Sequence, residues 1–233
     1  MARKKKVLQE TARKVVTYTN PRSYVAEQFR TLRTNINFSS ADGDIRSLVV
    51  TSAAPSEGKS TASANLAVVF AQEGKRVLLV DGDMRKPTTH YTFHMGNSQG
   101  LSSVLTRQTT IEDAIRPTVV ENLDLLTCGP IPPNPAELLA SKSMDALIGE
   151  LKDRYDLVIF DAPPVLSVTD GQILANKCEG TILVVNSGTT EKEMALKAKE
   201  AITSSNSRLI GAVLNNFILP KDNYYYQYYG AEK

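Results

Sequence analysis

Residues 47–73, SLVVTSAAPSEGKSTASANLAVVFAQE, contain three features in a fixed order. The short apolar run at 47–50 predicts a buried strand, and residues 59–73 predict a helix. The loop between them ends in Gly-Lys-Ser at 58–60. A loop with this ending, placed after a strand and at the start of a helix, is typical of a phosphate-binding P-loop.

The chemistry of this loop predicts a nucleotide site. Backbone N–H groups at a helix N-terminus point toward bound phosphates, and the helix dipole favours their negative charge. Lys59 is expected to reach the β- and γ-phosphates, and the Ser60 hydroxyl to bind Mg²⁺. The predicted nucleotide contacts from this loop are Glu57, Gly58, Lys59, Ser60 and Thr61.

The match to the P-loop pattern is incomplete. The full pattern has a glycine at the position of Ala53, and Ser56 stands where backbone freedom is useful. A Gly-Lys-Ser tripeptide by itself also occurs in ordinary surface loops. The flanking strand and helix favour the nucleotide site.

The remaining apolar runs indicate how the domain is built. Four of them read as buried strands and NLDLL reads as a weaker one, at 76–80, 156–160, 181–185, 208–215 and 122–126. They alternate with helical stretches, of which residues 190–203 are the clearest after 59–73. This order predicts an α/β fold, a doubly wound and mostly parallel sheet flanked by helices, of the P-loop NTPase type. The proline-rich residues 129–138 are expected to form an ordered loop.

Three aspartates follow two of these strands. Asp81 and Asp83 come after the run at 76–80, and Asp161 comes after the run at 156–160. Ligands of open parallel sheets bind at the carboxyl ends of the strands, so these side chains should face Lys59. A single aspartate in such a place is more often a helix cap or turn residue. Three of them beside a P-loop favour a Mg²⁺–nucleotide site.

Composition limits the alternatives. The chain has 233 residues, enough for one sizeable core, and a net charge of +2 argues against nucleic-acid binding through bulk charge. No stretch approaches the ~18 apolar residues of a membrane span, so a cytoplasmic protein is expected. Cys128 and Cys178 lack metal-ligand spacing and are expected to be reduced thiols.

The two ends of the chain differ from its middle. Residues 1–20, with a basic run at 3–6, and residues 220–233 are predicted to be mobile, and residues 21–219 to form the domain. The second terminal segment holds more than half of the nine tyrosines, namely Tyr224, Tyr225, Tyr226, Tyr228 and Tyr229.

Three motifs together resemble a known family. They are P-x-E-G-K-S-T at 55–61, where glycine is the family's usual x, D-x-D-x-R at 81–85 and D-x-P-P at 161–164. The chain is similar to the bacterial tyrosine kinases, P-loop kinases of capsule and exopolysaccharide synthesis. The separate cytoplasmic chains of Gram-positive bacteria match best. The likeness runs from Tyr24 to the tyrosine-rich end and includes residues 129–139.

The resemblance implies roles for the predicted site residues. Lys59 binds the phosphates of ATP and stabilises the transferred charge, while Ser60, Asp83 and Asp161 hold Mg²⁺. Asp81 lies nearest the incoming phenol and acts as general base, although spacing alone leaves open whether Asp81 or Asp83 does so. Asn215 is a candidate for hydrogen bonding to adenine, with a capping or turn role as its alternative.

The resemblance also implies that the terminal tyrosines are substrates, phosphorylated in the site of a neighbouring subunit. An aromatic docking segment and a stretch without a role are the alternatives. Glu27, Arg30 and Arg33 lie on one side of a predicted helix, whose apolar stripe is Phe29, Leu32 and Ile36. In the family, E-x-x-R-x-x-R is a contact that builds a ring, typically an octamer. A solvated face with intrahelical ion pairs is the alternative.

Partners and rival functions complete the expectations. Separate kinase chains are activated by a membrane adaptor of the polysaccharide chain-length type, which would hold this chain at the inner face of the membrane, and other protein substrates are possible. A partitioning or division-site ATPase switch shares the fold. Such switches carry Lys-Gly-Gly in the loop, which is absent here. A non-catalytic nucleotide-binding subunit is the third possibility.

Overall fold

The computed structural model describes residues 15–39 and 45–218. Its centre is a seven-stranded sheet in the order β3-β4-β2-β5-β1-β6-β7. The strands are β1 Ser47–Ser52, β2 Val77–Asp81, β3 Ile115–Pro117, β4 Leu123–Leu126, β5 Leu157–Asp161, β6 Gly180–Asn186 and β7 Leu209–Asn215. The helices in the described ranges are α2 Val16–Thr19, α3 Tyr24–Phe38, α4 Lys59–Gln72, α5 Thr89–Thr92, α6 Leu101–Leu105, α7 Ile111–Ala114, α8 Pro135–Ala140, α9 Lys142–Arg154, α10 Asp170–Lys177 and α11 Lys192–Ser204.

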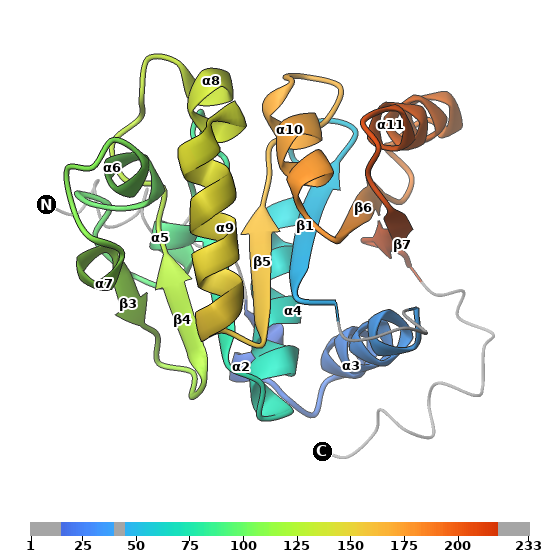
Figure 1. Cartoon of the computed structure of the whole chain (residues 1–233). Helices are drawn as coiled ribbons and strands as arrows, with labels where there is room; N and C mark the ends of the chain where they lie inside the picture. The colour runs from blue at the N-terminus through green and yellow to red at the C-terminus, as the bar shows by residue number, and fades with distance from the viewer. Residues whose placement is uncertain (1–14, 40–44, 219–233) are drawn as a thin grey trace, which may run out of the picture.

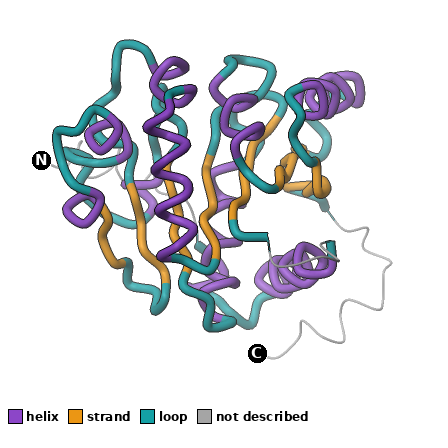
Figure 2. Tube along the Cα trace, in the orientation of Figure 1, coloured by secondary structure: helices purple, strands orange, loops and turns teal. Residues whose placement is uncertain are grey.

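The three central strands are continuously apolar because both of their faces are covered. Every residue of β1, β2 and β5 is buried. Helices α2, α3 and α4 pack on one face of the sheet, and α9 and α10 pack on the other (Figures 1 and 2). The prediction of a doubly wound, mostly parallel sheet is confirmed, and so are the two clearest helices.

Strand register brings the site residues to one edge of the sheet. β1 and β2 both pair with β5 in parallel, and Asp81 lies directly opposite Asp161. The arrowheads of β1, β4 and β5 accordingly point the same way in Figure 1. The loop after β1 therefore begins beside the ends of β2 and β5, where ligands of open α/β sheets bind.

Two segments differ from the sequence prediction. The proline-rich stretch predicted as a loop ends in helix α8, since Pro135 occupies the first helical turn, where its missing N–H has no intrahelical partner to lose. Strand β3 is short and antiparallel to β4, at the sheet's edge.

The predicted N-terminal boundary at residue 20 is too late. Residues 16–19 form α2, and Thr17 is fully buried against α4. The Thr17 backbone N–H and hydroxyl both donate to Asn65 Oδ1, at 3.0 and 2.9 Å. Val15, which is itself buried, is therefore already part of the folded domain.

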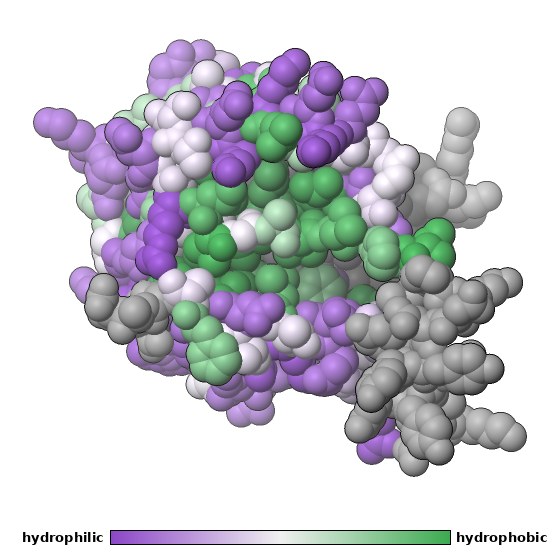
Figure 3. Space-filling view, turned by 90° about the vertical axis from the view of Figure 1, so that its right-hand side faces the viewer, coloured by the Kyte–Doolittle hydropathy of each residue, from purple (hydrophilic) through white to green (hydrophobic). Residues whose placement is uncertain are grey.

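The β7 edge of the sheet exposes apolar residues. Among the described residues β7 pairs only with β6, and Gly211, Ala212 and Leu214 are exposed. Figure 3 shows a hollowed apolar area on this side of the molecule, between two hydrophilic bands. Phe217 and Ile218 continue the exposed apolar sequence, at 55% and 87% exposure. An uncovered edge of this kind is a typical place for another chain to bind.

The cysteines and helices bear on two further expectations. Cys128 and Cys178 are buried and form no disulfide, and burial raises the pKa of both thiols. Within residues 15–39 and 45–218, no helix has both the length and the apolar character needed to cross a lipid bilayer.

Candidate nucleotide and magnesium site

The loop between β1 and α4 has the strained backbone of a tight phosphate cradle. Gly58 forms the N-cap of α4 in the left-handed region, at φ 98°. Ser56 also has a positive φ, of 66°, where L-residues with a side chain are disfavoured. The family's usual glycine at this position would adopt the same backbone without that cost.

We therefore predict that Ser56→Gly stabilises the protein. Glycine relieves the strain of the left-handed backbone, and its greater freedom in the unfolded chain offsets part of that gain. The free energy of unfolding should therefore rise by roughly 0.5–1 kcal/mol. Thermal unfolding measures the change. Ser187→Gly is the control, because Ser187 lies in another loop without a positive φ, and it should be neutral or destabilising. Equal losses in both variants would contradict the prediction.

Lys59 lies between two aspartates. Its Nζ donates to Asp83 Oδ2 at 2.9 Å and is 3.5 Å from Asp161 Oδ1. Burial alone would lower the pKa of Lys59, but the charges of Asp161 and Asp83 outweigh it and hold that pKa above its ordinary value. The lysine is therefore a fixed cation at the point where the sequence predicts phosphates.

The burial of Asp161 is only partly compensated. The side chain is fully buried, and neither carboxylate oxygen has a hydrogen-bond partner among the described residues. Burial raises the pKa of Asp161, and the nearby Lys59 opposes this only in part. A buried carboxylate with free acceptor atoms fits a site for a cation.

These residues fit Mg²⁺ held together with phosphate. Ser60, at the first turn of α4, is nearly buried, and its hydroxyl lies 3.4 Å from Lys59 Nζ. In the described ranges no group of three or more His, Cys, Asp or Glu is arranged to hold a metal ion by itself. Mg²⁺ commonly takes only one or two carboxylates and completes its shell with water and phosphate oxygens, so Ser60, Asp83 and Asp161 suffice.

Asp81 is packed behind this cluster. Its carboxylate is fully buried and accepts hydrogen bonds from the backbone N–H groups of Asp83, Thr88 and Thr89 and from the Thr89 hydroxyl. Burial, followed by the charge of Asp161, raises the pKa of Asp81 to about 7. That pKa suits a general base near neutral pH. Its assignment as the base remains a prediction, because the carboxylate is turned to its own loop.

The raised pKa of Asp81 predicts a pH-dependent stability of the nucleotide-free protein. The folded state binds more protons than the unfolded state between about pH 4 and about pH 7, so the free energy of unfolding should fall as the pH rises through this window and level off above it. A pKa shift of this size can change the free energy of unfolding by at most about 4 kcal/mol. Thermal unfolding between about pH 4 and about pH 7 should show a shallower decline in stability for Asp81→Asn than for wild type. Identical pH profiles of stability would contradict the raised pKa of Asp81.

A cavity of about 610 Å³ opens beside the cluster. Its walls include Lys59, Ser60, Asp83, Arg85, Lys86 and Asn215. Glu57, Asp81 and Asp161 do not line it. The cavity runs from the end of β7, past the P-loop, to the loop after β2, and this volume is typical of small-molecule sites.

Two residues that the sequence predicts to contact nucleotide, Glu57 and Asn215, form hydrogen bonds with protein groups in this structure. The Glu57 carboxylate is buried and accepts the backbone N–H groups of Ala53 and Ala54, at 2.8 and 3.1 Å. Asn215 lies on the cavity wall, but its Nδ2 donates to the Glu57 carbonyl at 3.0 Å. Contact between Asn215 and adenine thus remains a prediction, and Glu57 supports the loop in this structure.

Asp170, which holds the loop after β2 through Arg85, is a residue of the site that the sequence does not predict. Arg85 forms a two-point ion pair with the buried Asp170 of α10, at 2.9 and 3.0 Å. Arg85 was visible in the D-x-D-x-R pattern, whereas nothing local in the sequence marks Asp170 as its partner.

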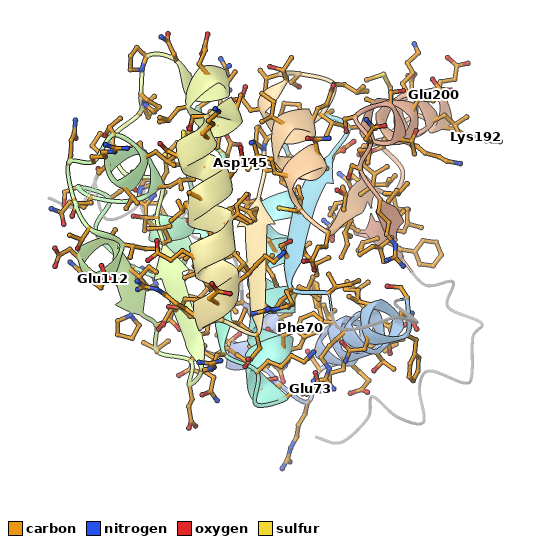
Figure 4. All side chains as sticks on the ribbon, in the orientation of Figure 1. Phe70, Glu73, Glu112, Asp145, Lys192 and Glu200 are labelled. Atoms are coloured by element: carbon orange, nitrogen blue, oxygen red, sulfur yellow. The ribbon has the colours of Figure 1, made fainter. Side chains whose placement is uncertain are left out.

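The predicted contact residues on α3 are not all free. Arg30 pairs with Glu27 at 2.7 Å, as in the solvated alternative. Arg33 donates to the Val69 carbonyl at 2.8 Å and lies 3.4 Å from Glu73, the residue that caps α4. Figure 4 labels Glu73 at the end of α4, near α3. The predicted apolar stripe of α3, formed by Phe29, Leu32 and Ile36, packs on the core, and Ile36 is buried.

Comparisons with known proteins agree with this geometry. The sequence matches the family described as an AAA domain over residues 55–190. The tyrosine-protein kinase YwqD of Bacillus subtilis (strain 168) is 53% identical over 220 residues, 94% of this chain and 92% of YwqD. The chain belongs to the bacterial tyrosine-protein kinases. The putative tyrosine-protein kinase CapB of Staphylococcus aureus is 43% identical to this kinase over 232 residues, with both chains covered in full.

Two solved structures allow a comparison with the kinases and with the division-site ATPases that share the fold. The chimerical protein CapA2B2 has a TM-score of 0.85 and 44% identity, covering 89% of this kinase and 93% of that chain. The septum site-determining protein MinD of Pyrococcus horikoshii OT3, complexed with Mg-ADP, has a TM-score of 0.65 and 25% identity, covering 76% and 72%. The likeness extends further along the chain in the first case, and the shared P-loop fold is one that binds nucleotide and Mg²⁺.

Proposed function

We propose that this chain transfers the γ-phosphoryl group of ATP to tyrosine. The observation that supports this most strongly is the cluster of Lys59, Asp83 and Asp161 at the end of the P-loop, beside a cavity of suitable size. The cluster combines one fixed cation with two carboxylates that share it, an arrangement suited to a Mg²⁺–triphosphate.

The proposed division of labour follows from charge. Mg²⁺, when bound, neutralises charge on the phosphate oxygens. Ser60, Asp83 and Asp161 would hold it, and Lys59, which lies between the two carboxylates, would contact the phosphates. Positioning and charge neutralisation dominate phosphoryl transfer, because the transition state is loose.

The base that receives the phenolic proton is Asp81 or Asp83. Asp81 has the pKa suited to the task but is enclosed by its loop. Asp83 lines the cavity but is paired with Lys59. Since a base contributes less than positioning in a loose transition state, replacing the true base should lower kcat and flatten the pH–rate profile while leaving nucleotide binding intact.

The proposed acceptors are the five terminal tyrosines, Tyr224, Tyr225, Tyr226, Tyr228 and Tyr229, which lie outside the described residues. The described chain ends at Ile218, three residues after Asn215 on the cavity wall. The seven residues 217–223 span at most about 25 Å when extended. Phosphorylation in trans, by a neighbouring subunit, is the form we propose.

A ring of subunits would supply that neighbour. The charged face of α3 and the apolar edge of β7 are the surfaces that we propose for a contact that closes into a ring. An octamer is the proposed size. Each phosphotyrosine adds roughly −1.5 to −2 charges, so a phosphorylated ring should loosen by repulsion.

We predict that Arg30→Glu shifts the assembly toward smaller species, since it reverses the charge at the centre of the proposed α3 contact. Light scattering coupled to size exclusion measures the mass. Arg22→Glu, which changes an exposed arginine just before α3, is the control and should leave the mass unchanged. An unaltered mass in Arg30→Glu, with the wild type oligomeric, would count against this interface.

A membrane adaptor is the proposed activator, and capsule or exopolysaccharide synthesis the proposed setting. The name of CapB and the composition of the CapA2B2 chimera support a two-chain system. The kinase would then act at the inner face of the membrane, with other proteins as further substrates.

The alternative is an ATPase switch without kinase activity. Incubation with γ-labelled ATP and Mg²⁺, with and without an activating adaptor, separates the two. Label on tyrosine supports the kinase, and release of labelled phosphate without labelled protein supports the switch.

A further inference from the structure

Glu57 is a buried anion whose charge is met by hydrogen-bond donors of the loop itself. Only 4% of the residue is exposed. Oε2 accepts hydrogen bonds, at 2.8 and 3.1 Å, from the backbone N–H groups of Ala53 and Ala54, which lie in the first half of the P-loop. Through its carboxylate, Glu57 therefore holds Ala53 and Ala54, in the first half of the loop, close to Gly58.

The other carboxylate oxygen depends on one residue from a distant element. Oε1 accepts a hydrogen bond from the hydroxyl of Thr190, in the loop between β6 and α11. Thr190 Oγ1 in turn accepts the Asn186 N–H at 3.0 Å. Because a carboxylate oxygen only accepts, the hydroxyl proton is directed at Glu57, while the hydroxyl oxygen accepts the backbone N–H. Thr190 thus holds a defined orientation at the end of β6.

The main chain of Glu57 is held as well. Asn215 Nδ2 donates to its carbonyl at 3.0 Å, and the same amide lies so close to Gly58 that a Cβ there would meet it at 2.0 Å. Asn216 Nδ2 donates to Asn186 Oδ1 at 2.9 Å, which joins the ends of β6 and β7. The second half of the loop, leading into Lys59, is thus fixed from both the side chain and the main chain of Glu57.

We propose that Thr190 is a positioning residue for phosphate binding, acting through Glu57 to hold the P-loop in its binding conformation. This rests on the proposed function, since it deepens the account of the same nucleotide site. Without the hydroxyl, Glu57 Oε1 is left buried without a donor, and the carboxylate must turn toward water or lose its hold on Ala53 and Ala54. The β6–α11 loop would then set the affinity for nucleotide without touching it.

The test measures Mg–ADP affinity of the full-length chain by isothermal titration calorimetry, together with thermal unfolding. Thr190→Val keeps the shape and removes the hydroxyl, so Mg–ADP binding should weaken about tenfold. Thr190→Ser restores the hydroxyl and should bind within about twofold of wild type. Thr189→Val is the matched control, because the exposed Thr189 hydroxyl makes only a 3.5 Å contact with Asn186.

A double-mutant cycle with Glu57→Ala shows whether Thr190 acts through Glu57. If it does, Thr190→Val should weaken binding no further in that background. The proposal is overturned if Thr190→Val binds Mg–ADP like wild type, if Thr190→Ser is as weak as Thr190→Val, or if the two losses add in full. Failure of wild type itself to bind Mg–ADP would instead reject the proposed function.

Discussion

Lys59→Met should reduce tyrosine phosphorylation by at least about a thousandfold, the loss expected when a charge-stabilising group is removed from a phosphoryl-transfer site. Methionine matches the length of the lysine chain but removes the cation 2.9 Å from Asp83 and 3.5 Å from Asp161. Initial rates of phosphotyrosine formation, detected by antibody or label, measure the effect.

The same substitution should also destabilise the nucleotide-free protein. It leaves Asp83 and the buried Asp161 without their positive partner, and breaking a buried pair is costly. Thermal unfolding therefore accompanies the activity assay, so that loss of folding is not mistaken for loss of catalysis. Lys197→Met, on the exposed side of α11, is the control and should retain both activity and stability. Substantial phosphorylation by folded Lys59→Met would contradict the proposed site.

The second large effect is expected for Asp161→Asn, with opposite signs for stability and activity. Asparagine has nearly the same shape and removes a buried charge whose oxygens have no hydrogen-bond partner in the described structure. Lys59 loses its 3.5 Å pairing with Asp161 but keeps its shorter pairing with Asp83, at 2.9 Å. The melting temperature of the nucleotide-free protein should rise. The increase in melting temperature on adding Mg²⁺–nucleotide should disappear, and the phosphorylation rate should fall by about a hundredfold or more.

Asp156→Asn is the matched control for this prediction. Asp156 precedes the same strand at its other end and forms an exposed ion pair with Arg76 at 3.1 Å. Exposed pairs contribute about 1 kcal/mol or less, so this variant should lose little stability and no activity. If Asp161→Asn lowered the stability of the nucleotide-free protein and kept its response to Mg²⁺–nucleotide, Asp161 would not be part of a metal site.

The sequence was sufficient for the fold and for the centre of the site. Continuous apolar strands, followed by Gly-Lys-Ser and by three aspartates, predict a parallel sheet whose carboxyl edge binds nucleotide. The structure brings Asp83 and Asp161 to Lys59, as this logic requires. The apolar periodicity and the alternation of strands and helices along the chain are local properties, so they can be read from the sequence directly.

The supports of the site could not be read in the same way. Glu57 carries a charge in a phosphate loop, which suggests contact with a ligand, yet its partners are Ala53, Ala54 and the distant Thr190. These partners are distributed over separate elements, and only folding brings them together. The partners of Arg33 were equally invisible: the E-x-x-R-x-x-R resemblance predicts a contact between subunits, which stays a prediction, and within the chain Arg33 also contacts Val69 and Glu73.

The central claim is that this chain phosphorylates its own terminal tyrosines at the site of Lys59. Mass-spectrometric mapping of the C-terminal peptide after incubation with Mg²⁺–ATP and an activating adaptor tests it most directly. We predict phosphoryl groups on tyrosines within residues 224–229 of the wild type. A C-terminal peptide without any phosphotyrosine, from a folded protein that binds Mg²⁺–ATP, would contradict it.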